Sequence, residues 1–170
     1  MTAPRNTTKS MTLHSRFIAV SAWLDRFPLS ILQLGMRVGV GLVFFNAGIL
    51  KFQSFEFAVK LFQEEYKLPL IDPAVAARMA TFTELTFPML LFLGLGSRLA
   101  TLPILGQILT IQIFVYPHAW NDHLFWASVL LFILTRGPGA LSLDYLIERY
   151  FAKRQQRVVR DSPPSMQVTG

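Results

Sequence analysis

The residues best suited to chemistry in this chain are charged side chains that interrupt long apolar runs. Arg37 lies in a run that continues to Leu50, and Glu84 lies near the middle of the next run. A charge at the centre of a membrane helix costs about 2.5–3.5 kcal/mol on insertion scales, so such residues face the protein interior and are candidates for function. The sequence therefore predicts a buried polar site around Arg37 and Glu84.

Two interpretations of this pair stay open. Depth in the membrane is counted from the ends of the two runs that lie on the same membrane face. At 1.5 Å per helical residue, Arg37 is roughly 9 Å deep and Glu84 roughly 16 Å deep. Two long side chains can close this offset. The first interpretation is a structural ion pair, or an Arg37 that snorkels to the headgroups. The second is a site that handles protons or contacts a quinone. Our leading expectation is that Arg37 and Glu84 contact each other and form the intramembrane polar site.

Further polar and small residues accompany this site. Gln107 and Gln112 lie in the third apolar run, where amides usually hydrogen-bond another helix. In the first run, glycines on the Arg37 face would let a second helix approach closely. That face has residues at i, i+4, i+7, i+11 and i+14: Arg37, Gly41, Phe44, Gly48 and Lys51.

The chain carries no strong metal or nucleophile motif. His118, Asp122 and His123 gather after the third run, but their spacing matches no strong metal signature. There is no cysteine, which excludes disulfides and thiolate-ligated metal clusters. We expect no metal site, and any electron carrier must be a partner, a quinone or a cofactor held without thiolates.

Composition points to a chain solvated by lipid. Hydrophobic residues make up 52% and charged residues 15%, whereas soluble domains carry about 25% charged residues. The net charge of +6 comes from basic residues beside apolar runs and in the tails. A membrane explains this placement better than nucleic acid, so we expect a lipid bilayer and no nucleic acid as partner.

Four apolar runs predict an all-α, polytopic membrane four-helix bundle. They cover about residues 31–50, 74–95, 99–116 and 123–135, and a span needs about 17–25 residues. The fourth is short and must recruit Trp120 and Asn121, or Gly137, to cross; a re-entrant segment is the alternative. The runs start the membrane domain at 31, after an N-terminal segment with the surface helix (1–30). A family resemblance extends this domain to 146 and leaves a basic C-terminal tail (147–170).

Short amphipathic helices are expected at the bilayer surface around these spans. One is predicted at 13–27, another inside 51–73 ended by Pro69 and Pro73, and a third after the last span with Ser142 as N-cap. Asp144 would lie in the first turn of the third helix, where a negative charge suits the helix dipole. From Lys153 onward the tail is expected to lack structure.

Basic residues near the span ends predict the orientation. One face of the membrane has most of the basic residues: Arg98, Arg136 and the arginines and lysines of both tails. The other face has fewer lysines and arginines. The richer side is cytoplasmic by the positive-inside rule. Both termini are therefore expected inside, which requires an even number of spans.

Several runs resemble the DoxX family of small bacterial membrane proteins over residues 31–146. They are Arg37 with Gly48-Ile49-Leu50-Lys51, then Glu84, then Leu93-Gly94-Leu95-Gly96-Ser97-Arg98, then Gly137-Pro138-Gly139-Ala140-Leu141-Ser142-Leu143-Asp144. The resemblance implies a four-helix bundle in the bacterial inner membrane and a loose redox connection, since the family is named after small subunits of a thiosulfate:quinone oxidoreductase. It supplies no agreed catalytic residues. With Lys51 and Arg98 added by resemblance, the candidate polar site is Arg37, Lys51, Glu84, Arg98, Gln107 and Gln112.

Three functions follow as hypotheses. The leading one is a membrane subunit or accessory protein of a quinone-linked redox system, with redox-complex proteins or a second copy of the chain as partners. A second is a non-catalytic membrane anchor or assembly factor. A third is a small transporter or handler of metals or peptides, whose site would be formed by Glu56, Glu64, Glu65, Asp72, His118, Asp122 and His123.

Overall fold

The computed structural model describes residues 13–161, and every regular element in that range is helical. The elements are α1 (Leu13–Leu24), α2 (Leu29–Gln53), α3 (Phe55–Leu61), η1 (Phe62–Tyr66), α4 (Pro73–Leu93), α5 (Ser97–Thr110), η2 (Ile111–Val115), α6 (Trp120–Arg136) and α7 (Leu143–Asp161). The two η elements are π-helical. The predicted all-α class is confirmed. The fourth apolar run does recruit Trp120 and Asn121 into its helix.

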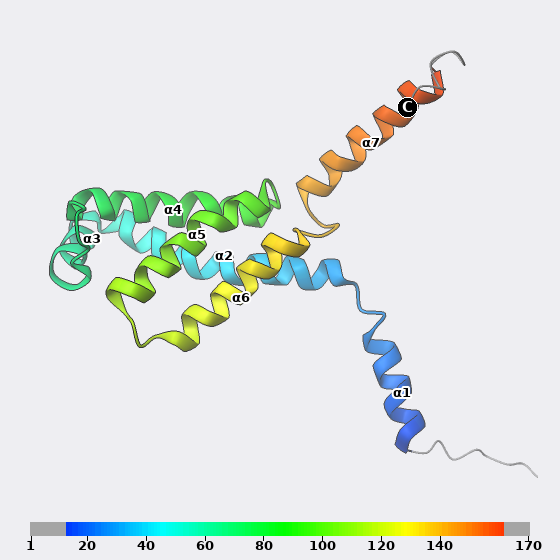
Figure 1. Ribbon diagram of the computed structural model, residues 1–170, viewed down its shortest axis with the longest axis horizontal. Helices are drawn as coiled ribbons and strands as arrows, with labels where there is room; N and C mark the ends of the chain where they lie inside the picture. Colours follow the sequence, from blue (N-terminus) through cyan, green and yellow to red (C-terminus); the bar gives the residue numbers. More distant parts are fainter. Residues whose placement is uncertain (1–12, 162–170) are drawn as a thin grey trace, which may run out of the picture.

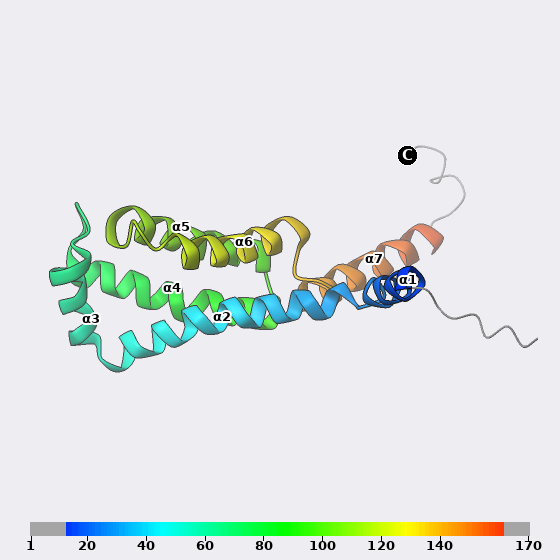
Figure 2. The ribbon, with the colours of Figure 1, turned by 90° about the horizontal axis from the view of Figure 1, so that it is seen from below.

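Four helices, α2, α4, α5 and α6, lie side by side around one core (Figures 1 and 2). The fully buried core side chains are Leu91, Ile104, Leu130 and Ile133. Outward-facing side chains on the same helices are also apolar; among them are Leu42, Phe82, Leu109 and Phe125. Two helical stretches, Leu29–Gln53 and Ser97–Val115, are long and apolar enough to cross a membrane.

Glycine permits the close contact between α2 and α4, as the sequence predicted. A Cβ on Gly48 would lie 2.9 Å from the Cβ of Glu84 and 3.0 Å from its backbone carbon. A Cβ on Gly41 would lie 2.5 Å from the ring of Phe92. Since Gly39 on the other side of α2 has nothing within 4 Å, only one face of this helix needs glycine.

The outlying helices match their predictions in part. Helix α1 extends away from the packed helices (Figure 1) and exposes its apolar stripe, including Phe17 and Leu24. The predicted loop helix exists as α3 and η1, but it ends at Tyr66, before Pro69. There Lys67 takes a left-handed conformation with φ 44°.

Helix α7 corrects the prediction that the tail from Lys153 lacks structure. The helix continues to Asp161. Its second half is rich in Lys, Arg and Gln, which are good helix formers, and neither glycine nor proline interrupts it. A helix that starts at Leu143 can therefore propagate through this polar sequence.

Asp144 joins two turns that are far apart in the chain. Its carboxylate accepts hydrogen bonds from the backbone amides of Gly96 (2.7 Å) and Ser97 (3.0 Å), and its own amide donates to the carbonyl of Gly94 (2.9 Å). Ser142 caps α7 as predicted, since its hydroxyl accepts from the amide of Tyr145. Although Asp144 lies in the first turn of α7, its carboxylate caps the N-terminus of α5.

Replacing Asp144 with alanine should lower the free energy of unfolding by about 1–2 kcal/mol, because two amides at the start of α5 lose their acceptor. Glu148→Ala, one turn further along α7 with an exposed side chain, is the matched control and should change stability by less than about 0.5 kcal/mol. Thermal unfolding in detergent measures both. Equal effects would show that the Asp144 cap contributes nothing beyond its charge.

Candidate functional site

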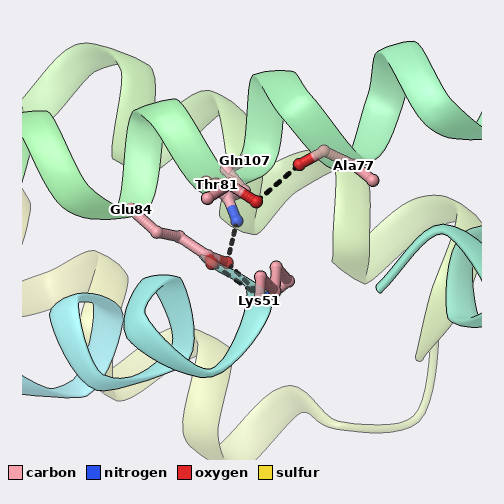
Figure 3. Close-up of polar contacts among 5 residues, drawn as sticks. All are labelled: Lys51, Ala77, Thr81, Glu84 and Gln107. Atoms are coloured by element: carbon pink, nitrogen blue, oxygen red, sulfur yellow. Dashed lines mark hydrogen bonds and ion pairs between the residues drawn. The ribbon is translucent and has the colours of Figure 1, made fainter. Parts of the chain in front are cut away.

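The site begins with an ion pair between α2 and α4. Nζ of Lys51 lies 2.9 Å from Oε1 and 2.8 Å from Oε2 of Glu84 (Figure 3). The two side chains are only 13% and 4% exposed. Gly48, one turn before Lys51, lets α4 come close enough for this contact. Glu84 is therefore a buried carboxylate with a cation against both of its oxygens.

Helix α5 adds Gln107 to the pair. Its Nε2 donates to Oε1 of Glu84 at 2.5 Å, and its Oε1 is buried without a hydrogen-bond partner. Flipping the amide would set its oxygen against the carboxylate, so the nitrogen must face Glu84 and the oxygen is the atom left over. Buried polar atoms normally have partners. The cluster thus keeps one acceptor that the described residues do not use.

Lys51, Glu84 and Gln107 form the polar wall of a cavity of about 320 Å³. The other lining side chains are mainly apolar and include Phe62, Leu68, Ile71, Met79, Ile111 and Val115. Small-molecule sites are typically apolar pockets of about 300–1,000 Å³ with a few convergent polar groups. The cavity is suited to an apolar molecule with a small polar head.

The two π-helical segments border this cavity. Phe62 and Tyr66 of η1 and Ile111 of η2 line it. The rings of Tyr66 and Tyr116 stack edge to face at 5.9 Å, and the hydroxyl of Tyr116 donates to Glu65. Burial, and secondarily the nearby Glu65 carboxylate, raises the pKa of Tyr66, so its phenol stays neutral at physiological pH. Short π-helical segments occur frequently at functional sites.

Arg37 does not pair with Glu84, so that prediction was wrong. Its guanidinium is fully buried and donates to the carbonyls of Leu91 (3.0 Å) and Leu141 (2.5 Å). Gly48 is level with Glu84, and Arg37 lies 11 residues earlier in α2, roughly 16 Å away along the axis. Arg37 instead ties α2 to the last turn of α4, where a cation suits the helix dipole, and to the link before α7.

The other candidate residues fall outside the cavity. Gln112 contacts Nδ1 of His123 at 2.6 Å and donates to the carbonyl of Pro117, which links η2 to α6 as a separate buried contact. Arg98 lies in the first turn of α5, with its guanidinium beside Gly137. Within residues 13–161, no three His, Asp or Glu side chains gather as a metal site.

Sequence reasoning missed the π-helical border of the cavity. Phe62 and Tyr66 belong to a predicted amphipathic loop helix, but nothing in the sequence marks where that helix becomes π-helical. The Lys51–Glu84 contact, in contrast, could have been inferred from the sequence. Gly48 and Lys51 share the small-residue face of α2, and Glu84 is the one carboxylate in the helix that packs there.

Comparison with known proteins gives one match. The model of the DoxX family matches residues 32–117, just over half of the chain, and ends before the Gly137–Asp144 run. No curated protein and no solved structure shows a significant match. The matched region contains the Lys51–Glu84–Gln107 wall and all the other residues that line the cavity. This chain is a membrane protein of the DoxX family.

Proposed function

We propose that the chain crosses the bacterial inner membrane four times, through α2, α4, α5 with η2, and α6, with both termini in the cytoplasm. The outward-facing side chains of α4 and α6 support this, since they include Phe82, Met89, Leu124 and Phe125. An apolar surface of this kind would be a liability in water. Helix α6 has 17 residues, the lower end of the range for a span.

Reporter fusions test this topology. Fusions after Arg26, Gln63, Ser97, Asn121 and Arg154 should report cytoplasm, outside, cytoplasm, outside and cytoplasm, because the Lys/Arg-rich ends stay inside. Paired reporters, one active on each side, serve as the control for expression. A fusion at Arg154 that is active outside would contradict the four-span arrangement.

We propose that the protein is a membrane subunit or accessory protein of a quinone-linked redox system, and that the cavity binds the quinone head. The observation that carries this proposal is the polar wall of Lys51, Glu84 and Gln107 in an otherwise apolar cavity. Burying a charge pair in a protein is costly. A bundle that served only to anchor a partner would need neither the pair nor a cavity beside it.

The lining fits the chemistry of a quinone. An apolar ring with two carbonyl oxygens matches an apolar cavity in which Lys51 offers an ammonium donor. The unpaired Oε1 of Gln107 would accept a hydrogen bond from a hydroxyl of the reduced quinol. Glu84 holds the ammonium in place through both of its oxygens. A bound quinone would supply the electron-accepting chemistry, which this cysteine-free chain does not supply through thiolates. The chain's residues would bind the head, orient it and keep water away.

The alternative functions find less support in the side-chain contacts. Three of the seven residues proposed for an outer metal or peptide site serve other contacts. Asp72 caps α4 by accepting from the amides of Ala74 and Val75. Glu65 accepts from Tyr116, and His123 contacts Gln112. The anchor hypothesis predicts co-purifying proteins without bound quinone.

Quinone affinity of the purified protein tests the proposal. Titration with a soluble quinone analogue in mild detergent should show saturable binding. Gln107→Leu should weaken it about 10-fold, because one polar contact is worth roughly 1 kcal/mol or slightly more. Gln63→Leu removes the same amide from the exposed face of η1 and should bind as the unmodified protein does. No binding, or equal affinity in both variants, would count against the proposal.

A further inference from the structure

A second hollow lies at the opposite end of the packed helices, where α5 begins, α6 ends and α7 starts. Its volume is about 470 Å³. Arg98 from the first turn of α5 and Arg136 from the end of α6 both line it, together with the Gly137–Ala140 link. It shares no residue with the cavity around Glu84.

Arg98 and Arg136, which line this hollow, have no side-chain partner among the residues that the structure describes. The guanidinium of Arg98 lies against the backbone after Arg136, since a Cβ on Gly137 would be 3.2 Å from its Nη2. Neither guanidinium makes a hydrogen bond or an ion pair within residues 13–161. Two arginines that line one hollow and have no partner in the described part of the chain are suited to bind an oxyanion with planar, paired donors.

The carboxylates that line the same hollow do not neutralise the two arginines. Asp144 is already engaged, because both of its oxygens accept from the amides of Gly96 and Ser97. Glu148 lies one helical turn further along α7, with an exposed side chain and no ion pair in the described range. The buried Arg37 adds a positive charge near Asp144. The free charge at the hollow is therefore mainly positive.

The apolar surface beside the hollow indicates which kind of molecule bears the oxyanion. Leu99 is 72% exposed and Ile147 is 44% exposed, and both line the hollow. The amphipathic helix α7 leaves from the same place and carries Arg149 and Lys153 in its first half and middle. In Figure 2 this end of the packed helices is the one from which α1 and α7 leave. An acyl chain along Leu99 and Ile147 would set a headgroup beside the two arginines.

We propose that this hollow binds the phosphate of an anionic phospholipid through Arg98 and Arg136. Basic pockets between helices on the cytoplasmic side suit such headgroups. The inference rests on the proposed membrane orientation and is independent of the quinone cavity. A lipid headgroup and free phosphate both carry a phosphate oxyanion. We assign the lipid as the ligand because Leu99 and Ile147 provide an apolar surface beside the arginines.

Native mass spectrometry of the full chain in neutral detergent tests this site. With equal amounts of phosphatidylglycerol and phosphatidylcholine, the protein should retain one phosphatidylglycerol in preference. The Arg98→Gln/Arg136→Gln variant should bind it at least about 10-fold more weakly. The Arg26→Gln/Arg154→Gln variant removes the same charge outside the hollow and should keep the preference. Equal loss in both variants, or no preference in the unmodified protein, would overturn the site.

Two further measurements test whether the ligand is a lipid and whether the guanidinium groups bind it. Excess inorganic phosphate should leave the lipid bound; complete displacement at millimolar phosphate would overturn the lipid as ligand. Should the glutamine variant fail to fold, Arg98→Lys/Arg136→Lys keeps both charges and removes the planar fork. This variant should still prefer phosphatidylglycerol, but with lower affinity. Affinity equal to that of the unmodified protein would overturn the role of the guanidinium groups.

Discussion

Replacing Glu84 with glutamine should lower the free energy of unfolding by about 3 kcal/mol, because Lys51 is left without its counter-ion in a mostly buried position. Lys51→Met should have a similar cost, since it strands the carboxylate. The double variant Lys51→Met/Glu84→Gln should be close to the unmodified protein, because no charge is then left unpaired and Gln107 keeps an amide oxygen to bond. Thermal unfolding in detergent gives all four values.

A second cycle provides the matched control. Arg37 and Glu84 are separated by roughly 16 Å along the helix axis, so Arg37→Gln and Glu84→Gln should add within about 0.3–0.5 kcal/mol. Coupling between Arg37 and Glu84, together with additivity between Lys51 and Glu84, would mean that the contacts in Figure 3 are not those of the protein in solution.

Alanine at two glycines of α2 should change stability in opposite directions. Gly48→Ala should destabilise by about 2 kcal/mol, because its Cβ meets the Cβ and backbone of Glu84 and the helices must separate. Gly39→Ala meets nothing within 4 Å and should stabilise by up to about 1 kcal/mol, the usual gain from alanine in a helix.

Gly39→Ala is the matched control for Gly48→Ala, since both variants replace glycine with alanine in the same helix. Thermal unfolding followed by far-ultraviolet circular dichroism measures each variant. Gly48→Ala should also weaken the Lys51–Glu84 coupling, because the ion pair depends on the close approach of α4. Equal shifts of one sign at both positions would rule out a close α2–α4 contact at Gly48.

Helix positions could be predicted because they depend on local sequence. Apolar runs of sufficient length define α2, α4 and α5 with η2, and Trp120 and Asn121 complete α6 as expected. The glycine face of α2 was also predictable, since Gly41 and Gly48 recur at helical spacing. Local helix propensity even extends α7 beyond Lys153, where a polar composition had suggested disorder.

The relative height of neighbouring helices could not be predicted in the same way. Depths counted from the ends of the apolar runs set Arg37, and not Lys51, opposite Glu84. The two runs do not begin at one height, so that count shifted the register by several residues. Gly48 against Glu84 fixes the register, and only the packed structure shows that contact. The capping of α5 by Asp144 depends on the same long-range packing.

The most direct measurement is the quinone affinity of Lys51→Met/Glu84→Gln. This variant is expected to fold with nearly unchanged stability, so a change in binding reports on the polar wall and not on unfolding. We predict that it loses at least about 10-fold in affinity for a soluble quinone analogue, while Gln63→Leu binds normally. Unchanged affinity in a folded double variant would contradict the assignment of Lys51, Glu84 and Gln107 as the quinone site.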